Sequence, residues 1–319
     1  MEAGKNDLPK ETEQLWPKIS IHILYAPHAT ERDVEPIREK FIVADIYIPE
    51  AEGWTNDQLQ AFRMVSEGEI TPAQLFQSQG LRRVDAQHFY ASLEMVRNSH
   101  KPIIFIDVPR EHKNVEAFFK WEKESIRVHG SFDDQLQRVK DWVKEKAEME
   151  KEREDYMRSM LPIKIKEILN EYPDIKRRDS LNILVALGSQ HTRLYSKLKQ
   201  EGYDVNKEEI PSYGFFDKGM KAYMFGGDID DELAAKIFLE EEFATAYKKD
   251  INGLTDNVIN RLHLKQKIIS QFSFTEAREI FEEIRGRGTT RDIFSKKLKE
   301  KGIRFPQSPA QLKAFIADP

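Results

Sequence analysis

The stretch 181–205, LNILVALGSQHTRLYSKLKQEGYDV, decides the fold class of this chain. Its first part, 181–187, is a short apolar run with the length and the Ile, Val and Leu content of a buried strand. The polar segment 192–200 that follows has helical character, and Gly202 has the position of a helix C-cap. Residues 203–205 then begin a further strand. This order of strand, helix and strand indicates a sheet with helices on its faces.

Three more apolar runs, each bounded by residues that break regular structure, predict strands earlier in the chain. Helical patterns separate these runs, and a long, strongly charged helix is predicted from about 133 to 172. We therefore expect an α/β (or α+β) fold with a mixed, largely parallel sheet flanked by helices. The three runs are 19–25 (ISIHILY), 42–48 (IVADIYI) and 103–108 (IIFIDV).

Toward the C-terminus the pattern changes to helices alone, which predicts an all-helical appendage. The chain is therefore expected to divide into a flexible N-terminus (1–14), an α/β domain (15–228) and a helical C-terminal domain (229–319). The helices predicted in the last part are 229–249, 256–271, 274–286, 290–300 and 308–317.

The composition excludes several classes of chemistry. The 319 residues contain no cysteine, so disulfides, thiolate metal sites, iron–sulfur clusters and cysteine nucleophiles are ruled out. The net charge of -5, from 50 Lys and Arg against 55 Asp and Glu, gives no overall attraction to nucleic acid or to an anionic membrane. The polar first segment lacks the apolar core of a secretory signal, so we expect a cytoplasmic, soluble protein with no membrane partner.

Missing motifs narrow the function further. There is no G-x-G-x-x-G segment after a strand, no Walker A loop, no G-x-S-x-G elbow and no H-E-x-x-H helix, so no nucleotide cofactor is expected. The basic segments 175–180 and 294–305 are short and lie in an acidic chain, which disfavours a nucleic-acid partner.

Three titratable residues follow predicted strands, at the positions where ligands usually bind in parallel sheets. His28 follows the first strand, Glu50 the second and His191 the fourth. Two imidazoles and a carboxylate could bind a divalent metal ion, or could form an acid–base pair around a substrate.

Five segments place these residues in an informative order. They are 26–41 (APHATERDVEPIREKF), 42–53 (IVADIYIPEAEG), 89–109 (FYASLEMVRNSHKPIIFIDVP), 152–160 (EREDYMRSM) and 181–205. Together they resemble the motifs of the TraB/Tiki/GumN superfamily, which includes the ChaN-like and erythromycin-esterase-like proteins. That family has a His after a first strand, a Glu after a second, an Asp at the end of a third, an arginine-bearing helix and a final strand followed by a His.

The resemblance implies a hydrolase that attacks an ester, lactone or peptide carbonyl of a small-molecule or peptide substrate with an activated water. In a metal-dependent member, His28, Glu50 and His191 would hold one divalent ion, Mn, Co, Fe or Zn. In a metal-free member, a His would be the general base and Glu50 would orient it. Arg153 matches the family arginine, and would bind a developing oxyanion or anchor Glu50. Glu52 is the alternative to Glu50 as the match to the family glutamate.

Three further residues are candidates for the substrate site. Asp107 ends the third predicted strand, where it would orient Arg153, support the site or cap the loop. Arg193, at a helix start, would contact an anionic substrate group. Trp54 would line a substrate pocket or close a small apolar cluster. His22 lies inside the first predicted strand and is expected to pack there. The other histidines have no partner at ligand spacing and are predicted to lie on the surface; they are His88, His100, His112, His129 and His263.

The sequence also allows a function other than catalysis. The family usually has glycine before the first His, whereas this chain has Pro27 there. This departure suits a catalytically inactive scaffold whose helical tail binds a protein partner or forms a homo-oligomer. Convergence of the His–Glu–His set around a polar cavity would support the enzyme, and a pocket filled by Tyr25 or Trp54 would support the scaffold.

Overall fold

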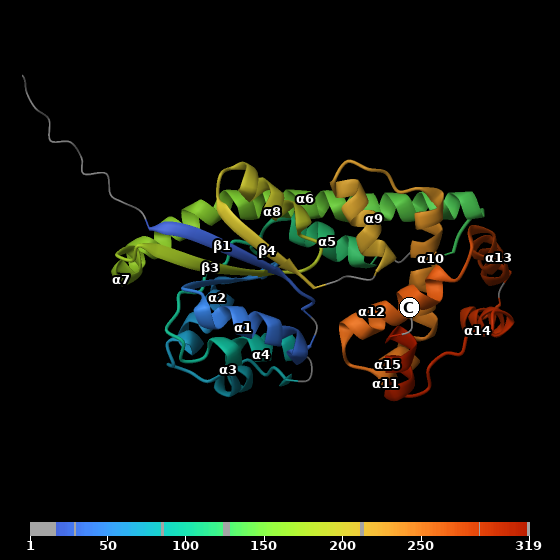
Figure 1. The fold of residues 1–319 in the computed structure, drawn as a ribbon, viewed down its shortest axis with the longest axis horizontal. Coiled ribbons are helices and arrows are strands. Elements are labelled where there is room, and N and C mark those ends of the chain that lie inside the picture. The colour runs from blue at the N-terminus through green and yellow to red at the C-terminus, as the bar shows by residue number, and fades with distance from the viewer. Residues whose placement is uncertain are drawn as a thin grey trace, which may run out of the picture.

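A four-stranded sheet lies between two layers of helices (Figure 1) in the computed structural model, which describes residues 17–28, 30–83, 86–123, 128–210, 214–286 and 288–317. The strand order is β2-β3-β1-β4, and each pairing in this sheet is parallel. The expected α/β fold is confirmed, with a sheet that is parallel throughout rather than mixed. The strands are β1 (Lys18–Tyr25), β2 (Ile46–Pro49), β3 (Ser180–Leu187) and β4 (Asp204–Glu209).

Helices α6 and α8 cover one face of this sheet, and helices α1 to α4 lie against the other (Figure 1). The helices predicted at 133–172 and 192–200 are confirmed by α6 and α8. The elements up to this point in the chain are η1 (Glu31–Val34), α1 (Glu35–Val43), α2 (Asn56–Ser66), α3 (Pro72–Ser78), α4 (Gln87–Val96), α5 (Lys113–Lys123), α6 (Phe132–Glu171), α7 (Pro173–Lys176) and α8 (Thr192–Gln200).

Strand β3 shows why the sheet forms between two helical layers. Its side chains at odd positions from Leu181 to Leu187 pack in a cluster with α6 and α8. Leu184 and Ala186 point the other way, into a cluster with α1, α2 and α4. A strand that is apolar on both faces can be buried only in this kind of sandwich, because either exposed face would cost hydrophobic free energy.

Two strand predictions are wrong in part. In 42–48, residues 42 and 43 belong to the end of α1, and only Ile46–Pro49 form the strand. The run 103–108 is buried but makes only an isolated parallel bridge, Tyr47 with Ile103. The next bond of a parallel ladder would need an N–H from residue 49. Pro49 has none, so the pairing stops after one bridge.

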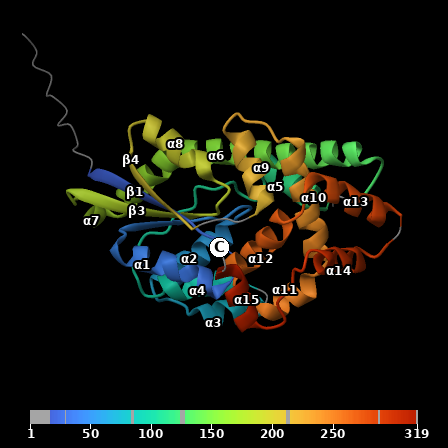
Figure 2. The ribbon, with the colours of Figure 1, turned by 45° about the vertical axis from the view of Figure 1, so that its right-hand side comes forward.

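The last third of the chain, from residue 215 on, is helical (Figure 2). Its buried side chains form a hydrophobic cluster separate from those on the sheet. The predicted segment 229–249 is divided into two helices, α10 and the beginning of α11. The helices are α9 (Phe215–Met224), α10 (Asp231–Ala246), α11 (Lys248–Leu254), α12 (Val258–Ser270), α13 (Phe274–Arg285), α14 (Thr290–Glu300) and α15 (Pro309–Ala317).

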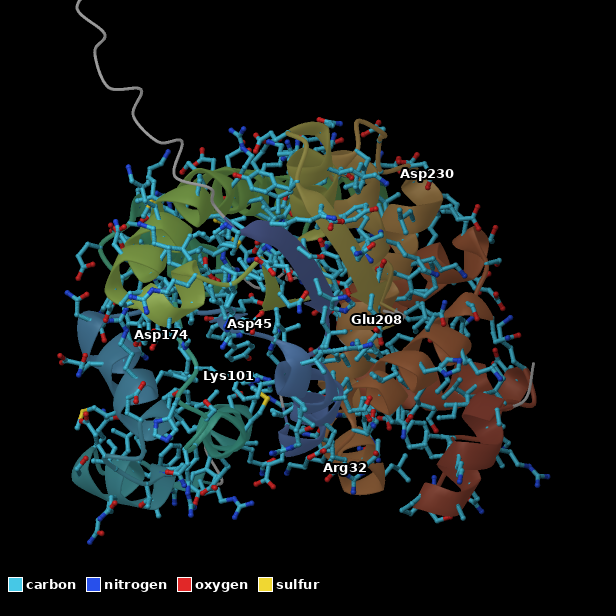
Figure 3. The ribbon with its side chains drawn as sticks, turned by 60° about the vertical axis from the view of Figure 1, so that its left-hand side comes forward. Arg32, Asp45, Lys101, Asp174, Glu208 and Asp230 are labelled. Atoms are coloured by element: carbon cyan, nitrogen blue, oxygen red, sulfur yellow. The ribbon has the colours of Figure 1, made fainter. Side chains whose placement is uncertain are left out.

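Helix α6 joins the two halves. Its first part, from Phe132 to Ala147, contributes to the helical cluster, and its second part, from Met157 to Leu169, contributes to the cluster on the sheet. Arg32 of η1 also faces the helical half (Figure 3), with its Nη1 3.1 Å from Asp256 Oδ1. The helical core therefore draws on residues before position 229, and the division at 228 stays a prediction.

The predicted N-terminal segment 1–14 lies outside the described residues. Among the helices of the described ranges, none is both long and apolar enough to span a bilayer.

Candidate functional site

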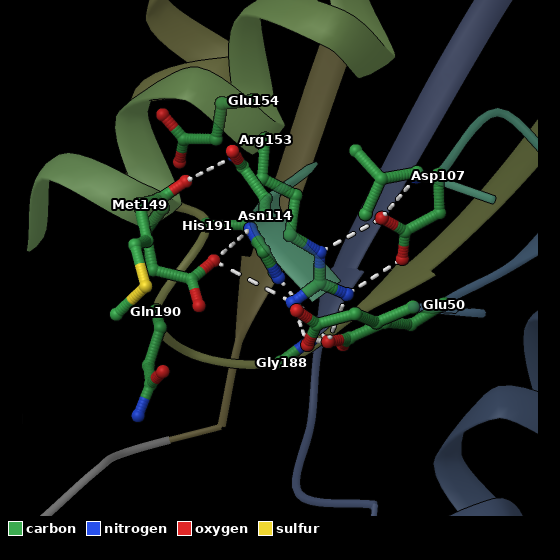
Figure 4. A network of polar contacts seen from close by, with 12 residues as sticks. Glu50, Asp107, Asn114, Met149, Arg153, Glu154, Gly188, Gln190 and His191 are labelled. Atoms are coloured by element: carbon green, nitrogen blue, oxygen red, sulfur yellow. Dashed lines mark hydrogen bonds and ion pairs between the residues drawn. The ribbon is translucent and has the colours of Figure 1, made fainter. Parts of the chain in front are cut away.

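The candidate residues meet at the edge of the sheet where the strands end. His28 follows β1, Glu50 directly follows β2, and His191 lies between β3 and α8. Because the strands are parallel, their carboxyl ends lie at one edge, and the loops after them converge there. Buried charged residues of α6 approach this edge from the helical layer above the sheet (Figure 4).

Glu50 is the centre of the cluster. Its Oε2 is 3.1 Å from His28 Nε2, and its Oε1 is 3.2 Å from His191 Nε2. Arg153 Nη2 donates to Oε1 at 2.8 Å, and the backbone N–H of Gly188 donates to Oε2. Burial by itself would raise the pKa of Glu50, but the nearby Arg153 and His191 hold that pKa well below its usual value. Glu50 is therefore a carboxylate at neutral pH.

Arg153 is buried and contacts several acidic residues of the cluster. Only 3% of its side chain is exposed, and Nε and Nη2 donate to the two oxygens of Asp107 at 2.7 and 2.6 Å (Figure 4). Its Nη1 is 3.0 Å from Glu52 Oε2 and 3.5 Å from Glu150 Oε2. Of the two expected roles, this geometry matches the anchoring of Glu50, because the guanidinium is surrounded by carboxylates.

His191 lies between two carboxylates. Its Nε2 faces Glu50, and its Nδ1 is 3.4 Å from Glu150 Oε2, while its side chain is 1% exposed. Burial lowers the pKa of His191 and Arg153 lowers it further, but Glu50 and Glu150 outweigh both, so the pKa is raised. A buried imidazole of this kind holds a proton rather than accepting one from a substrate.

A cavity of about 190 Å³ opens beside Glu50. The titratable side chains that line it are His28, Tyr47, Glu50, Glu52 and His88. Trp54 lines it as well, and also packs against the apolar cluster of α1, α2 and α4, so both sequence interpretations of this residue stay open. Its Nε1 donates to the backbone oxygen of Asp107 at 2.7 Å. Tyr25 does not fill the cavity, because its side chain is fully buried in the core on the α6 side of the sheet.

The remaining candidates lie behind the cavity wall. Asp107 and Arg153 are almost fully buried and are not among its lining residues, and the same is true of His191. Arg193 is not in the lining either, and its backbone N–H donates to Glu154 Oε1 at 3.1 Å. Asp107 therefore lies in contact with Arg153, and Arg193 lies outside the cavity lining.

His88 is the site residue that the sequence prediction missed. Its Nε2 is 3.3 Å from His28 Nδ1, and the two rings meet edge to face with centroids 4.8 Å apart. Burial, with a smaller contribution from His28, lowers the pKa of His88 to about 3. The sequence predicted a surface position for His88 because no possible ligand partner lies near it in the sequence, and this prediction was wrong. It does share one face of α4 with the buried Ala91, Ser92 and Met95, and that periodicity was the available signal.

Three more buried groups come from the charged helix α6. Glu150 and Lys146 form an ion pair with both side chains buried, and Glu150 also contacts His191. Glu154 is fully buried, and burial raises its pKa to about 7. Alternating charges in 145–158 are typical of a solvated helix, so the sequence pattern alone did not reveal them. Their spacing of four residues on one face is the signal that it contained.

The expected divalent metal ion stays a prediction, and the arrangement around Glu50 gives it little support. In the part of the chain that the structure describes, no group of three or more His, Asp or Glu side chains could hold an ion. Both Glu50 oxygens already accept N–H bonds, from Arg153 and from the Gly188 backbone. An ion bound to Glu50 would also lie beside the positive guanidinium of Arg153, which would repel it.

No protein-family model, no curated protein and no solved structure matches this chain. The resemblance to the TraB/Tiki/GumN superfamily therefore stays a prediction from the five sequence segments. The case for a function rests on the geometry of the cluster around Glu50.

Proposed function

We propose that this protein is a hydrolase that attacks the carbonyl group of an ester, lactone or peptide with an activated water. One observation carries the proposal: His28, Glu50 and His191, which follow three different strands, converge within hydrogen-bond distance beside a cavity. Such a buried cluster of charged groups costs desolvation free energy, which a purely structural role would not require.

The imidazole pair His28–His88 is the proposed general base. His28 Nε2 lies 3.1 Å from the ionised Glu50 carboxylate, which favours the tautomer with the proton on Nε2 and the lone pair on Nδ1. That nitrogen faces His88 Nε2, so a proton taken from water by the pair can be passed to His28. The positive charge then lies next to the Glu50 carboxylate, which stabilises it.

Glu52 is the proposed proton donor to the leaving group. It lines the same cavity, and burial raises its pKa although Arg153 opposes this shift. Glu50 and Glu52 are two carboxyl groups of one loop whose environments move their pKa values in opposite directions. This is the arrangement expected of a base partner and an acid in one site.

His191, Arg153 and Asp107 are positioning residues in this proposal. They do not line the cavity, and each is bound to Glu50 or to a residue that is bound to Glu50. Their contribution is a rigid Glu50 carboxylate that keeps its charge as the base is protonated.

The first experiment is a hydrolysis screen with ester, lactone and peptide substrates, followed by His28→Ala and Glu50→Gln on the best substrate. We expect each variant to lose 10²–10⁴-fold in kcat/KM, as is typical of a lost general base. The control is His100→Asn, which changes an exposed imidazole and suits the positive φ at that position. A His28→Ala protein that keeps its activity would refute the proposal.

Two other outcomes would favour the other expectations from the sequence. Bound Mn, Co, Fe or Zn at about one equivalent, lost in His28→Ala, would replace the general-base proposal by metal-assisted hydrolysis. A folded protein that hydrolyses no substrate in the screen would favour the inactive scaffold with a protein partner.

A further inference from the structure

We propose that the cavity selects an uncharged acyl group about the size of one aromatic ring. This inference rests on the proposed hydrolase function and adds to it the class of substrate. Three properties of the cavity carry it: aromatic side chains in its lining, the absence of Lys and Arg from that lining, and a small volume.

Aromatic side chains form a large part of the cavity lining. The rings of Trp54 and Phe62 each meet Phe105 edge to face, with centroids 5.6 Å apart in both pairs. Phe89 meets Phe62 in the same way, also at 5.6 Å. Interlocked rings of this kind hold one another in place, so the wall is a preformed apolar surface. The lining aromatic residues are Tyr47, Trp54, Phe62, Phe89 and Phe105.

The charges at the cavity are unfavourable for an anionic ligand. Glu50 and Glu52 line it, and no lysine or arginine of the described chain does. Arg153 binds both carboxylates from behind, with 3% of its side chain exposed, so it is not available to a ligand. A ligand carboxylate would therefore lose its hydration and gain no ion pair. Because Arg153 and His191 already contact Glu50, and Glu52 is the proposed neutral proton donor, a ligand cation would find little unpaired charge either.

The volume limits what the cavity can enclose. A cavity of about 150 Å³ is large enough for benzene, and drug-sized ligands occupy about 300 Å³ or more. At about 190 Å³, this cavity can enclose one ring or a branched chain of similar bulk. His28 and Glu50 belong to the same lining, so the carbonyl of an enclosed acyl group would lie beside the proposed base. A long alkyl chain or a macrocycle would have to remain outside.

The test compares 4-nitrophenyl esters, which share one leaving group and differ only in the acyl part. We expect kcat/KM for the benzoate to exceed that for the acetate at least tenfold, and the values for the hemisuccinate and the palmitate to fall below that for the acetate. Ser92 is 3% exposed and lines the cavity, so Ser92→Leu would fill part of it. In that variant we expect the benzoate-to-acetate ratio to fall at least fivefold. Equal values for all four esters, or a preference for the anionic one, would overturn the inference.

A binding measurement separates this inference from the hydrolase proposal. Saturation-transfer NMR is run on the wild-type protein with acetophenone, benzoate and benzylammonium, which are a neutral, an anionic and a cationic ring. We expect a signal for acetophenone that Ser92→Leu removes, and no signal for the two ions. If no ester is hydrolysed but acetophenone binds in this way, the hydrolase proposal fails and the ligand class stands. If esters are hydrolysed without acyl preference and benzoate binds as well as acetophenone, the hydrolase proposal stands and the ligand class is wrong.

Discussion

The wild-type protein should lose stability as the pH rises because of Glu154 in α6, and the substitution Glu154→Gln should remove this loss. The Glu154 side chain is fully buried, and its Oε1 accepts the backbone N–H of Arg193 at 3.1 Å. Its Oε2 has no hydrogen-bond partner among the described residues. Burial raises the pKa of Glu154 to about 7, so the folded protein keeps the proton that the unfolded chain has already released. Glutamine has the same shape, keeps the acceptor oxygen and does not titrate.

The size of the effect follows from the two pKa values. The unfolded chain releases the Glu154 proton near pH 4.5, and the folded protein releases it near pH 7. Between these values the folded state binds more protons, so the free energy of unfolding falls as the pH rises. At 1.36 kcal/mol per pH unit, the whole window corresponds to about 3 kcal/mol. The penalty is absent below pH 4.5 and complete above pH 7.

Urea unfolding followed by circular dichroism, at steps from pH 4.5 to pH 8.5, measures this effect. We expect the free energy of unfolding of Glu154→Gln, relative to wild type, to increase by about 3 kcal/mol across the range. Glu152→Gln, which changes an exposed carboxylate two residues away, is the matched control. A Glu154→Gln difference that stays constant with pH, or follows that of the control, would show that Glu154 is ionised in the folded protein.

Three further substitutions test the cluster. Arg153→Met leaves several buried carboxylates without their shared cation, so the free energy of unfolding in urea should fall by about 3–5 kcal/mol. Gly188→Ala places a Cβ 3.1 Å from Glu50 Oε2, and should lower kcat/KM tenfold or more with little change in stability. Gly253→Ala, where nothing lies within 4 Å, is its control and should leave kcat/KM unchanged. His88→Phe keeps a ring but removes the imidazole that faces the proposed base, so kcat/KM should fall about 10²-fold or more and its pH profile should change shape. An unchanged profile would exclude His88 from the proton-accepting pair.

Local pattern was sufficient for most of the secondary structure. Helix α8 begins and ends at the predicted residues because an apolar strand, a polar helix and a C-terminal glycine follow one another within a short stretch. The helices of the C-terminal half were predicted for the same reason, since helical periodicity is a property of neighbouring residues. The run 103–108 was misjudged because strand formation depends on the partner strand, and Pro49 of that partner lacks an N–H.

The candidate site was predictable only where a residue follows a strand. The positions of His28, Glu50 and His191 were visible because parallel strands bring their carboxyl ends to one edge. His88 was not visible, because it reaches the site from a helix, 60 residues after His28. Glu150 and Glu154 belong to a charged run that has the pattern of a solvated helix.

The α/β class and the helical C-terminal part could therefore be predicted from local periodicity, and the three strand-end residues from their positions after predicted strands. Which charges are buried, and which protonation states they adopt, depends instead on the packing of distant segments. Glu50 is ionised because Arg153, 103 residues away, lies against it, and Glu154 titrates near neutral pH because the fold removes water from it. A pKa depends on the distance to other charges and on access to water, and both are set by packing between segments that are far apart in the chain.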